Sequence, residues 1–343
     1  MDVPGPADAS AAARGGAPDA ARLAVVLIGR NEGARLEAAF ASLGALAART
    51  VYVDSGSTDA SVAAAAATGA LVVDLDMDRP FTAARARNEG AARALAAWPG
   101  LDAIQFMDGD CSLDPAWIAT AAGFLKTHPD VAVVAGRRRE RHPERSVYNW
   151  LCDREWAAPA GEATECGGDA LMRVSAFVAA GGYSADLIAG EEPELCVRLR
   201  AAGWRIYRLA DPMTLHDAAM TRFSQWWKRS ARAGHAFAEV EARHRGSPFG
   251  IWRANVRRIV LWGGVLPLVA ILGGLLVHPA FLALLLAYPA QVARLALREG
   301  AGRRESWIAA TFLVLARFPE LAGLLRFYRN RLLGRRSALL EYK

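Results

Sequence analysis

The stretch Ile104-Gln105-Phe106-Met107-Asp108-Gly109-Asp110 decides how the rest of the chain is read. Its apolar run ends abruptly in two carboxylates, which is typical of a buried parallel strand whose carboxyl end faces a ligand site. Side chains alternate along an extended segment, so Asp108 and Asp110 point to the same side. Gly109 leaves room for a ligand to approach the backbone. Two such oxygen ligands suit Mg²⁺ or Mn²⁺ shared with a diphosphate, although a solvated turn is the alternative.

Strand and helix patterns alternate on both sides of this stretch. Short apolar runs predict strands at 23–28, 51–54, 70–73, 103–108, 131–135 and 205–209. Helical periodicity predicts helices that end near 46, that cover 60–67, 82–97 and 115–126, that follow Ala170 to about Ala180, and that cover 193–202. This alternation indicates an α/β fold with a mostly parallel sheet and right-handed crossovers.

Polar clusters follow the first, second and fourth strands, at the sheet edge where a nucleotide would lie. The first is the loop Gly29-Arg30-Asn31-Glu32-Gly33, and the second is Asp54-Ser55-Gly56-Ser57-Thr58-Asp59. Neither a G-x-x-x-x-G-K-[ST] loop nor a G-x-G-x-x-G turn follows the first strand, so the nucleotide fingerprints of other folds are absent. Residues 137–165 are polar and are interpreted as a linker or an acceptor-facing insertion.

Hydrophobic residues make up 53% of the 343, and their excess lies after residue 258. Segments 259–277 and 280–297 are almost uninterruptedly apolar and have the length that spans a bilayer. Arginines flank the pair at both ends, at positions 257, 258, 298, 303 and 304. We therefore expect a transmembrane hairpin with both ends in the cytoplasm, the alternative being a buried hairpin of a soluble protein.

A third apolar segment, 307–328, is interrupted by four residues: Arg317, Pro319, Glu320 and Arg326. Its charges favour an interfacial or re-entrant helix over a third span. The net charge is +6, and all but three of the 41 basic residues are arginine. Because much of this charge lies beside apolar segments, we interpret it as membrane-flanking and expect no nucleic-acid partner.

The four scattered cysteines form no zinc-site spacing and fit a reducing compartment. Residues 1–21 are rich in Ala, Gly and Pro and lack the pattern of a signal peptide, so we expect a disordered tail.

Five motifs, taken in order, resemble those of the family 2 glycosyltransferases, which have a GT-A fold, over roughly residues 22–236. They are Asn31-Glu32; Asp54 to Asp59; Ala86-Arg87-Asn88 with Gly90; Asp108-Gly109-Asp110; and Gly181-Gly182-Tyr183 followed by Glu191-Glu192-Pro193-Glu194-Leu195 with Arg198. The C-terminal hairpin and the ending Glu341-Tyr342-Lys343 are similar to membrane-anchored bacterial members.

The resemblance implies an inverting transfer of a sugar from a nucleoside diphosphate, assisted by a divalent cation, Mg²⁺ or Mn²⁺. It implies that Asp54 bonds the base, that Arg87 contacts base or phosphate, and that Asp108 contacts the ribose or the metal's water shell. Asp110 would bind the metal, with His216 as a further ligand or, alternatively, a structural histidine. The remaining expected donor-site residues are Gly29, Asn31, Glu32, Asn88 and Gly109.

The catalytic base departs from the family's usual Glu-Asp pair, because Glu192 stands where the Asp is expected. A carboxylate within hydrogen-bond reach of an acceptor hydroxyl can still act as the base, and Glu191 is a possible substitute. The alternative role for both is favourable charge at a helix N-terminus.

The segment after the core, Ser224 to Arg229 with Arg232, resembles an acceptor or diphosphate groove. Its candidate residues are Asp169, Gln225, Trp226, Arg229 and Arg232. The processive signature Gln-x-x-Arg-Trp is not matched, which favours single-sugar transfer.

The expected organisation is a tail at 1–21, a GT-A domain at 22–236, a juxtamembrane linker at 237–258, a transmembrane hairpin at 259–297, and an interfacial helix with a basic tail at 298–343. The resemblance implies a bacterial inner-membrane enzyme whose catalytic domain is cytoplasmic and whose acceptor is an envelope glycan or glycolipid. A polyprenyl phosphate acceptor and a catalytically silent scaffold stay open. A nucleotidyltransferase would need a Gly-rich basic loop after the first strand, which the chain lacks.

Overall fold

The structure is a computed structural model that describes residues 22–335. The expected disordered tail and the terminal Glu341-Tyr342-Lys343 lie outside the described residues. The described chain divides into two compact units. The first comprises residues 22–142, 152–185 and 191–218, and the second comprises 143–151, 186–190 and 219–335.

The first unit is built on a nine-stranded sheet. Its strands are β1 (Leu23–Gly29), β2 (Thr50–Asp54), β3 (Leu71–Asp74), β4 (Ala103–Asp108), β5 (Cys111–Leu113), β6 (Val131–Glu140), β7 (Gly161–Ala163), β8 (Ala170–Arg173) and β9 (Arg205–His216). They lie in the order β3-β2-β1-β4-β8-β6-β9-β5, with β7 paired to β9. The expected parallel arrangement holds for β3, β2, β1 and β4, whereas the other half of the sheet is mixed.

Three expectations for the mixed half were wrong. Residues 171–173 begin the predicted helix but lie in β8, because this strand pairs antiparallel with both β4 and β6. Strands β6 and β9 run five and seven residues past their predicted ends at 135 and 209, because their polar halves pair with each other. Part of the supposed linker at 137–165 is therefore sheet.

Helices cover both faces of this sheet, and the period-two alternation of the strands supplies both cores. Val26 and Phe106 pack into one cluster, whereas their neighbours Leu27 and Met107 pack into the other. The helices are α1 (Ala34–Leu43), η2 (Gly44–Arg49), α2 (Ser61–Ala67), α3 (Ala83–Ala97), α4 (Trp117–Thr127), α6 (Val174–Ala179) and α7 (Glu191–Ala201). Helix α3 lies close to the sheet because Gly90 has no side chain: a Cβ there would lie 2.5 Å from Val26 Cγ1.

The second unit is helical. Its elements are η3 (Pro143–Arg145), α8 (Phe223–Arg243), α9 (Arg253–Ile259), the π-helical η4 (Val260–Val265), α10 (Leu266–Leu276), the 3₁₀ segment η5 (Pro279–Leu286), α11 (Ala287–Gly300), α12 (Arg304–Leu315) and α13 (Arg317–Leu332). Helix α5 (Val147–Trp156) begins in this unit and ends in the first.

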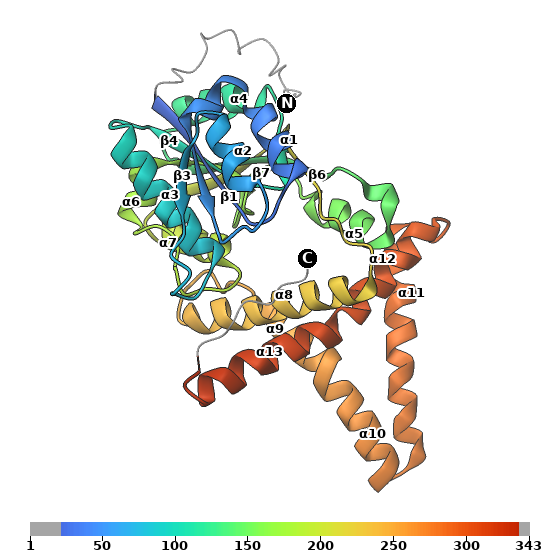
Figure 1. Ribbon diagram of the computed structural model, residues 1–343. Helices are drawn as coiled ribbons and strands as arrows, with labels where there is room; N and C mark the ends of the chain where they lie inside the picture. The colour runs from blue at the N-terminus through green and yellow to red at the C-terminus, as the bar shows by residue number, and fades with distance from the viewer. Residues whose placement is uncertain (1–21, 336–343) are drawn as a thin grey trace, which may run out of the picture. The chain divides into compact units, whose positions relative to one another are not determined.

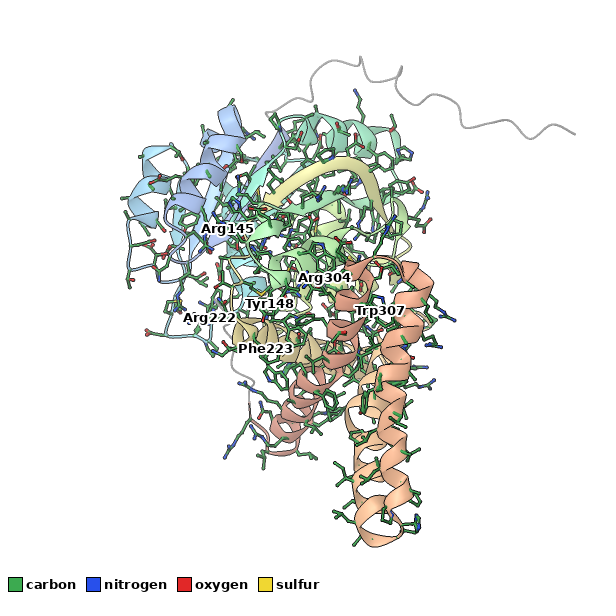
Figure 2. All side chains as sticks on the ribbon, turned by 90° about the vertical axis from the view of Figure 1, so that its right-hand side faces the viewer. Arg145, Tyr148, Arg222, Phe223, Arg304 and Trp307 are labelled. Carbon is green, nitrogen blue, oxygen red and sulfur yellow. The ribbon has the colours of Figure 1, made fainter. Side chains whose placement is uncertain are left out.

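Helices α8 and α13 lie side by side (Figure 1). Two glycines allow the contact: a Cβ on Gly234 would lie 2.0 Å from the carbonyl oxygen of Glu320, and one on Gly323 would lie 1.8 Å from that of Ala231. Aromatic rings extend the packing, because Phe312 of α12 contacts both Tyr148 and Trp226 edge-on. Figure 2 labels Tyr148 and, at the start of α8, Phe223, which stacks on Trp226 in a tilted arrangement.

Three helices of the second unit are long and apolar enough to cross a membrane. Arg253–Leu276 covers all but the last residue of the predicted span 259–277, Pro279–Gly300 contains the predicted span 280–297, and Arg304–Leu332 contains the third apolar segment. Much of the hairpin's apolar surface is exposed; Leu275 and Leu276 at its tip keep more than three quarters of their surface accessible.

Candidate active site

The predicted ligand edge forms where β2, β1 and β4 end together. Gly29 at the end of β1 is in register with Asp54, and Ile28 is in register with Asp108. The backbone packs closely here, because a Cβ on Gly109 would lie 3.1 Å from the carbonyl oxygen of Ile28 and 3.1 Å from Glu32 Cγ. Glu32, in turn, forms an ion pair with Arg35 at 2.8 Å.

Asp54 and Asn31 hold the two loops that follow β1 and β2. Asp54 Oδ2 accepts hydrogen bonds from the backbone N–H groups of Gly56 and Ser57 at 2.9 and 2.7 Å, and its Oδ1 accepts one from the hydroxyl of Tyr52. Asn31 adopts a left-handed conformation, and its Oδ1 accepts a hydrogen bond from the N–H of Thr58 at 2.7 Å. Both predicted donor-site residues therefore shape this edge of the sheet.

Arg87 of α3 is the centre of the site. Its guanidinium is 3% exposed and contacts three carboxylates: Nη2 lies 2.7 Å from Asp108 Oδ1, and Nη1 lies 2.7 Å from Glu191 Oε1 and 2.9 Å from Glu192 Oε1. Burial opposes its charge, but the three carboxylates prevail and keep the pKa of Arg87 well above its ordinary value. Three of the predicted motifs thus meet at the buried guanidinium of Arg87.

Two backbone features keep this cluster in place. Asn88 donates to the carbonyl of Tyr183 at 2.8 Å and accepts from its N–H at 2.9 Å, which fixes the Gly181-Gly182-Tyr183 turn. The ring of Tyr183 then lies 5.7 Å from the guanidinium carbon of Arg87. Gly168 leaves the space that the charged groups need, because a Cβ there would lie 2.5 Å from Arg87 Nη2 and 2.9 Å from Asp108 Oδ2.

Sequence reasoning missed Arg138, which it placed in the polar linker or insertion at 137–165. Arg138 lies on the unexpected extension of β6, and its Nη2 contacts Asp169 Oδ2 at 2.7 Å and Asp108 Oδ2 at 3.3 Å. Asp169 is buried and also accepts hydrogen bonds from the N–H of Asp108 and the hydroxyl of Thr214. Alternation along a strand that continues to residue 140 would have shown that Arg138 and Glu140 share a face.

Glu192 differs from the other carboxylates of the cluster in its electrostatics. Burial and, next, the charge of Glu191 raise its pKa to about 7, although Arg87 acts in the opposite direction. Its side chain is 13% exposed, whereas that of Glu191 is 4% exposed. Glu192 therefore combines access to a ligand with a pKa suited to proton transfer near neutral pH.

Asp110 and His216 are brought together by the antiparallel pairing of β5 with β9. His216 Nε2 lies 3.3 Å from Asp110 Oδ2, and Nδ1 faces Glu140 Oε2 at 3.7 Å. Burial lowers the pKa of His216, so the ring is neutral near pH 7. His216 Nδ1 is buried without a hydrogen-bond partner, and when it carries the ring's proton the Nε2 lone pair faces the Asp110 carboxylate, an arrangement that a cation between the two atoms would stabilise.

The donor set fits a divalent cation. Two ligand atoms of one Mg²⁺ or Mn²⁺ at right angles are about 3.0 Å apart, close to the Asp110–His216 separation. Six carboxyl groups lie in this part of the site, and Arg87 and Arg138 contact four of them; the carboxyl groups are Asp108, Asp110, Glu140, Asp169, Glu191 and Glu192. Cys111 lies close enough to serve as a ligand, but burial raises the pKa of its thiol well above the ordinary value, so it is not a thiolate.

The other predicted groove residues lie in the second unit, on α8. Gln225 Oε1 accepts hydrogen bonds from the N–H groups of Thr221 and Arg222 at the start of the helix. Trp226 is buried against Phe312, and Arg229 and Arg232 are half-buried. The ring of Trp156, in the first unit, covers Arg138 at 5.3 Å and contacts His216.

Comparison with known proteins gives one family and a set of similar folds. Residues 24–177 match the family model described as Glycosyl transferase family 2. No protein of curated function matches the sequence significantly. Among solved structures, the fold is similar to that of a mannosyltransferase from Pyrobaculum calidifontis in complex with GDP-Man and Mn²⁺, with a TM-score of 0.58, 19% identity, and coverage of 89% of this chain and 87% of that chain.

Two further structures are more distant. TarS of S. aureus has a TM-score of 0.47 and 16% identity, with coverage of 71% of this chain and 48% of that chain. Glucosyl-3-phosphoglycerate synthase from Mycobacterium tuberculosis, in complex with phosphoglyceric acid, has a TM-score of 0.46 and 22% identity, with coverage of 64% and 79%. The expected GT-A fold is confirmed by the family match and the mannosyltransferase.

Proposed function

Residues 24–177 belong to glycosyl transferase family 2, and from this premise we propose that the chain is an inverting glycosyltransferase that uses a nucleoside-diphosphate sugar and a divalent cation. The carrying observation is the charge cluster around Arg87, which unites Asp108, Glu191 and Glu192 at the carboxyl edge of the sheet. Such an edge is the ligand-binding edge of open α/β sheets.

Glu192 is proposed as the general base. A single displacement requires one group to take the proton of the acceptor hydroxyl while the sugar leaves its diphosphate. The raised pKa and partial exposure of Glu192 suit this role, and Glu191 keeps its neighbour's pKa high. We infer that Glu192 takes the role of the family's Asp.

Asp110 and His216 are proposed as the protein ligands of the cation, with Glu140 orienting the imidazole. A bound Mg²⁺ or Mn²⁺ would neutralise the charge that develops on the leaving diphosphate. The mannosyltransferase with the similar fold is in complex with Mn²⁺ and GDP-Man, which supports this class of cofactor and donor. Asp108, held between Arg87 and Arg138, is proposed to contact the donor.

We propose that the hairpin formed by α10, η5 and α11 anchors the enzyme in the bacterial inner membrane with its catalytic domain in the cytoplasm. Exposed apolar side chains on the hairpin and arginines at both of its ends support this placement. The acceptor would be an envelope glycan or a lipid-linked sugar, and a polyprenyl phosphate belongs to the same class. A silent scaffold is less favoured, because the charged cluster is intact.

Donor binding in detergent tests this proposal. Purified protein is titrated with UDP-, GDP- and dTDP-sugars with and without Mn²⁺, alongside Asp110→Asn and, as a matched control, Asp102→Asn. Asp102 is exposed and pairs only at the surface with Arg22. We expect one donor to bind in a Mn²⁺-dependent manner, with binding lost in Asp110→Asn alone. Absence of binding to every donor by folded protein would favour the scaffold.

A further inference from the structure

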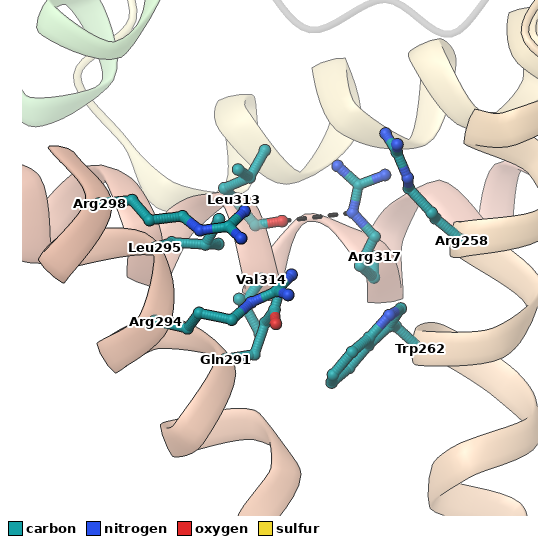
Figure 3. A pocket seen from close by; sticks show the side chains of 9 residues that line it. All are labelled: Arg258, Trp262, Gln291, Arg294, Leu295, Arg298, Leu313, Val314 and Arg317. Atoms are coloured by element: carbon teal, nitrogen blue, oxygen red, sulfur yellow. Dashed lines mark hydrogen bonds between the residues drawn. The ribbon is translucent and has the colours of Figure 1, made fainter.

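The helices of the second unit enclose a basic pocket that takes no part in the site described above. Its volume is about 310 Å³, at the lower end of the range for small-molecule sites. It is lined by Arg258, Trp262, Gln291, Arg294, Leu295, Arg298, Leu313, Val314 and Arg317. Figure 3 shows Arg294 and Arg298 reaching into it from α11, while Arg258 and Arg317 stand on the opposite side.

All charged residues that line this pocket are positively charged. Four of its nine lining residues are arginines, and none is acidic. Arg317 is offset by Glu320 at 2.8 Å and donates to the carbonyl of Leu313. Within residues 22–335, the other three form no ion pair. Arg294 and Arg298 are one helical turn apart, a spacing at which like charges repel unless an anion lies between them.

The pocket lies where the basic ends of the hairpin meet its apolar surface. Arg258 precedes η4, and Arg294 and Arg298 fall in the last turns of α11. Toward the tip, exposed side chains are apolar, including Leu268, Leu272, Leu275, Leu282 and Leu286. Basic pockets between membrane helices at this level suit phosphate head groups, whose hydrocarbon chains then follow the apolar helices.

We propose that this pocket binds the phosphate head group of a membrane lipid. Guanidinium groups form bidentate, charge-assisted hydrogen bonds with phosphate, so two or three arginines can share one head group. Trp262 forms the apolar floor, and its position is fixed by Tyr288, whose hydroxyl donates to the Trp262 carbonyl at 2.5 Å and whose ring contacts both Trp262 and Phe318. The proposal rests on membrane attachment but not on the donor reaction.

The experiment measures how much the phosphate head group and the hydrocarbon chains each contribute to binding. Full-length protein in neutral detergent is titrated with dioctanoyl phosphatidic acid, with dioctanoylglycerol, which has the tails alone, and with inorganic phosphate, which has the head alone. The variants are Arg294→Gln/Arg298→Gln and Arg258→Gln. Their controls are Arg303→Gln/Arg304→Gln and Arg257→Gln, which remove the same charge from neighbouring positions outside the pocket.

We expect phosphatidic acid to bind at least about tenfold more tightly than dioctanoylglycerol, because each bidentate contact contributes roughly one order of magnitude. The pocket variants should lose about tenfold or more, whereas the controls should stay within about twofold. Equal binding of the two lipids, equal losses in Arg257→Gln and Arg258→Gln, or saturation by inorganic phosphate at the same concentrations would each overturn the proposal.

Two measurements on the same preparations distinguish failure of the pocket proposal from misfolding of the variants, failure of the glycosyltransferase proposal and lack of membrane attachment. Donor titration shows whether the pocket variants are folded and whether the glycosyltransferase proposal itself holds. Flotation with phosphatidylcholine vesicles tests membrane attachment. Protein that floats and binds a donor but shows no preference for the phosphate-bearing lipid would contradict the pocket proposal alone.

Discussion

At the scale of single residues, the site depends on the protonation of Glu192. Its raised pKa of about 7 means that the carboxylate form, which the base requires, predominates only above that pH. We therefore expect kcat/KM to rise with pH through an apparent pKa near 7. Glu192→Gln should lower kcat by about 10²–10⁴ while donor binding persists. Steady-state rates across the pH range measure both, and a Glu192→Gln variant that kept the same pH profile would exclude this base.

Glu191 gives a second test of the same electrostatics. Its negative charge is the second largest cause of the raised pKa of Glu192. Removing that charge in Glu191→Gln should lower the pKa of Glu192, so the acidic limb of the rate profile should move to lower pH. The control is Glu194→Gln, which removes an acid of the same helix that pairs with Arg198 instead. A shift of similar size in the control would contradict the assigned coupling.

Gly168 provides a prediction about space. In Gly168→Ala the new methyl carbon would lie 2.5 Å from Arg87 Nη2 and 3.2 Å from Glu192 Oε1, so the charged groups must move. We expect kcat/KM to fall about tenfold or more, because misplaced groups lose transition-state contacts. Gly167→Ala is the matched control, since nothing lies within 4 Å of its added carbon. Equal activities of the two variants would show that the cluster tolerates displacement.

The residues of the site were predictable from sequence where they occur in short local motifs. Asp54, Arg87, Asp108 and Glu192 occur in short patterns, and the structure brings the last three together. Arg138 was missed because its neighbours on the chain are other charged residues, which indicate solvent. The pairing of β6 with both β8 and β9 brings it to Asp169, and such long-range pairing leaves no local signal.

At the scale of elements, errors arose where apolar runs were short. Residues 170–173 are Ala-Leu-Met-Arg, which have no strong strand propensity, and the sheet makes them a strand because β4 and β6 leave a gap that one strand fills. The parallel half was easier, because its strands β1, β2 and β3 are rich in Val and are separated by clear helical repeats.

The crossing of α8 and α13 gives a prediction about stability. In Gly323→Ala the added carbon would lie 1.8 Å from the Ala231 carbonyl oxygen, so the helices must separate. Overpacking of this kind costs about 1–3 kcal/mol, and we expect the melting temperature in detergent to fall by several degrees. Gly246→Ala, whose added carbon meets nothing within 4 Å, should leave the melting temperature unchanged. An unchanged value for Gly323→Ala would show that the helices are not held this closely.

At the scale of the whole molecule, the number of membrane spans depends on α13. Its length and composition, together with α12, would allow a third crossing. However, α13 packs along α8, whose exposed face is charged, and it buries Glu320 and Asn330 within the protein. If α13 crossed the membrane, the charged face of α8 packed along it would enter the hydrocarbon, which costs free energy. Both helices are therefore expected at the membrane surface.

Single-cysteine labelling distinguishes two spans from three. The native cysteines are all buried and should react little with an impermeant maleimide. Ala280→Cys lies in the exposed hairpin turn, Gly246→Cys lies between α8 and α9, and Leu333→Cys follows α13. With two spans, Gly246→Cys and Leu333→Cys should be labelled from one side of sealed vesicles and Ala280→Cys from the other. Labelling of Leu333→Cys from the same side as Ala280→Cys would show that α12 and α13 cross the membrane. Residues 246 and 333 can lie on opposite sides only if an odd number of membrane spans lies between them.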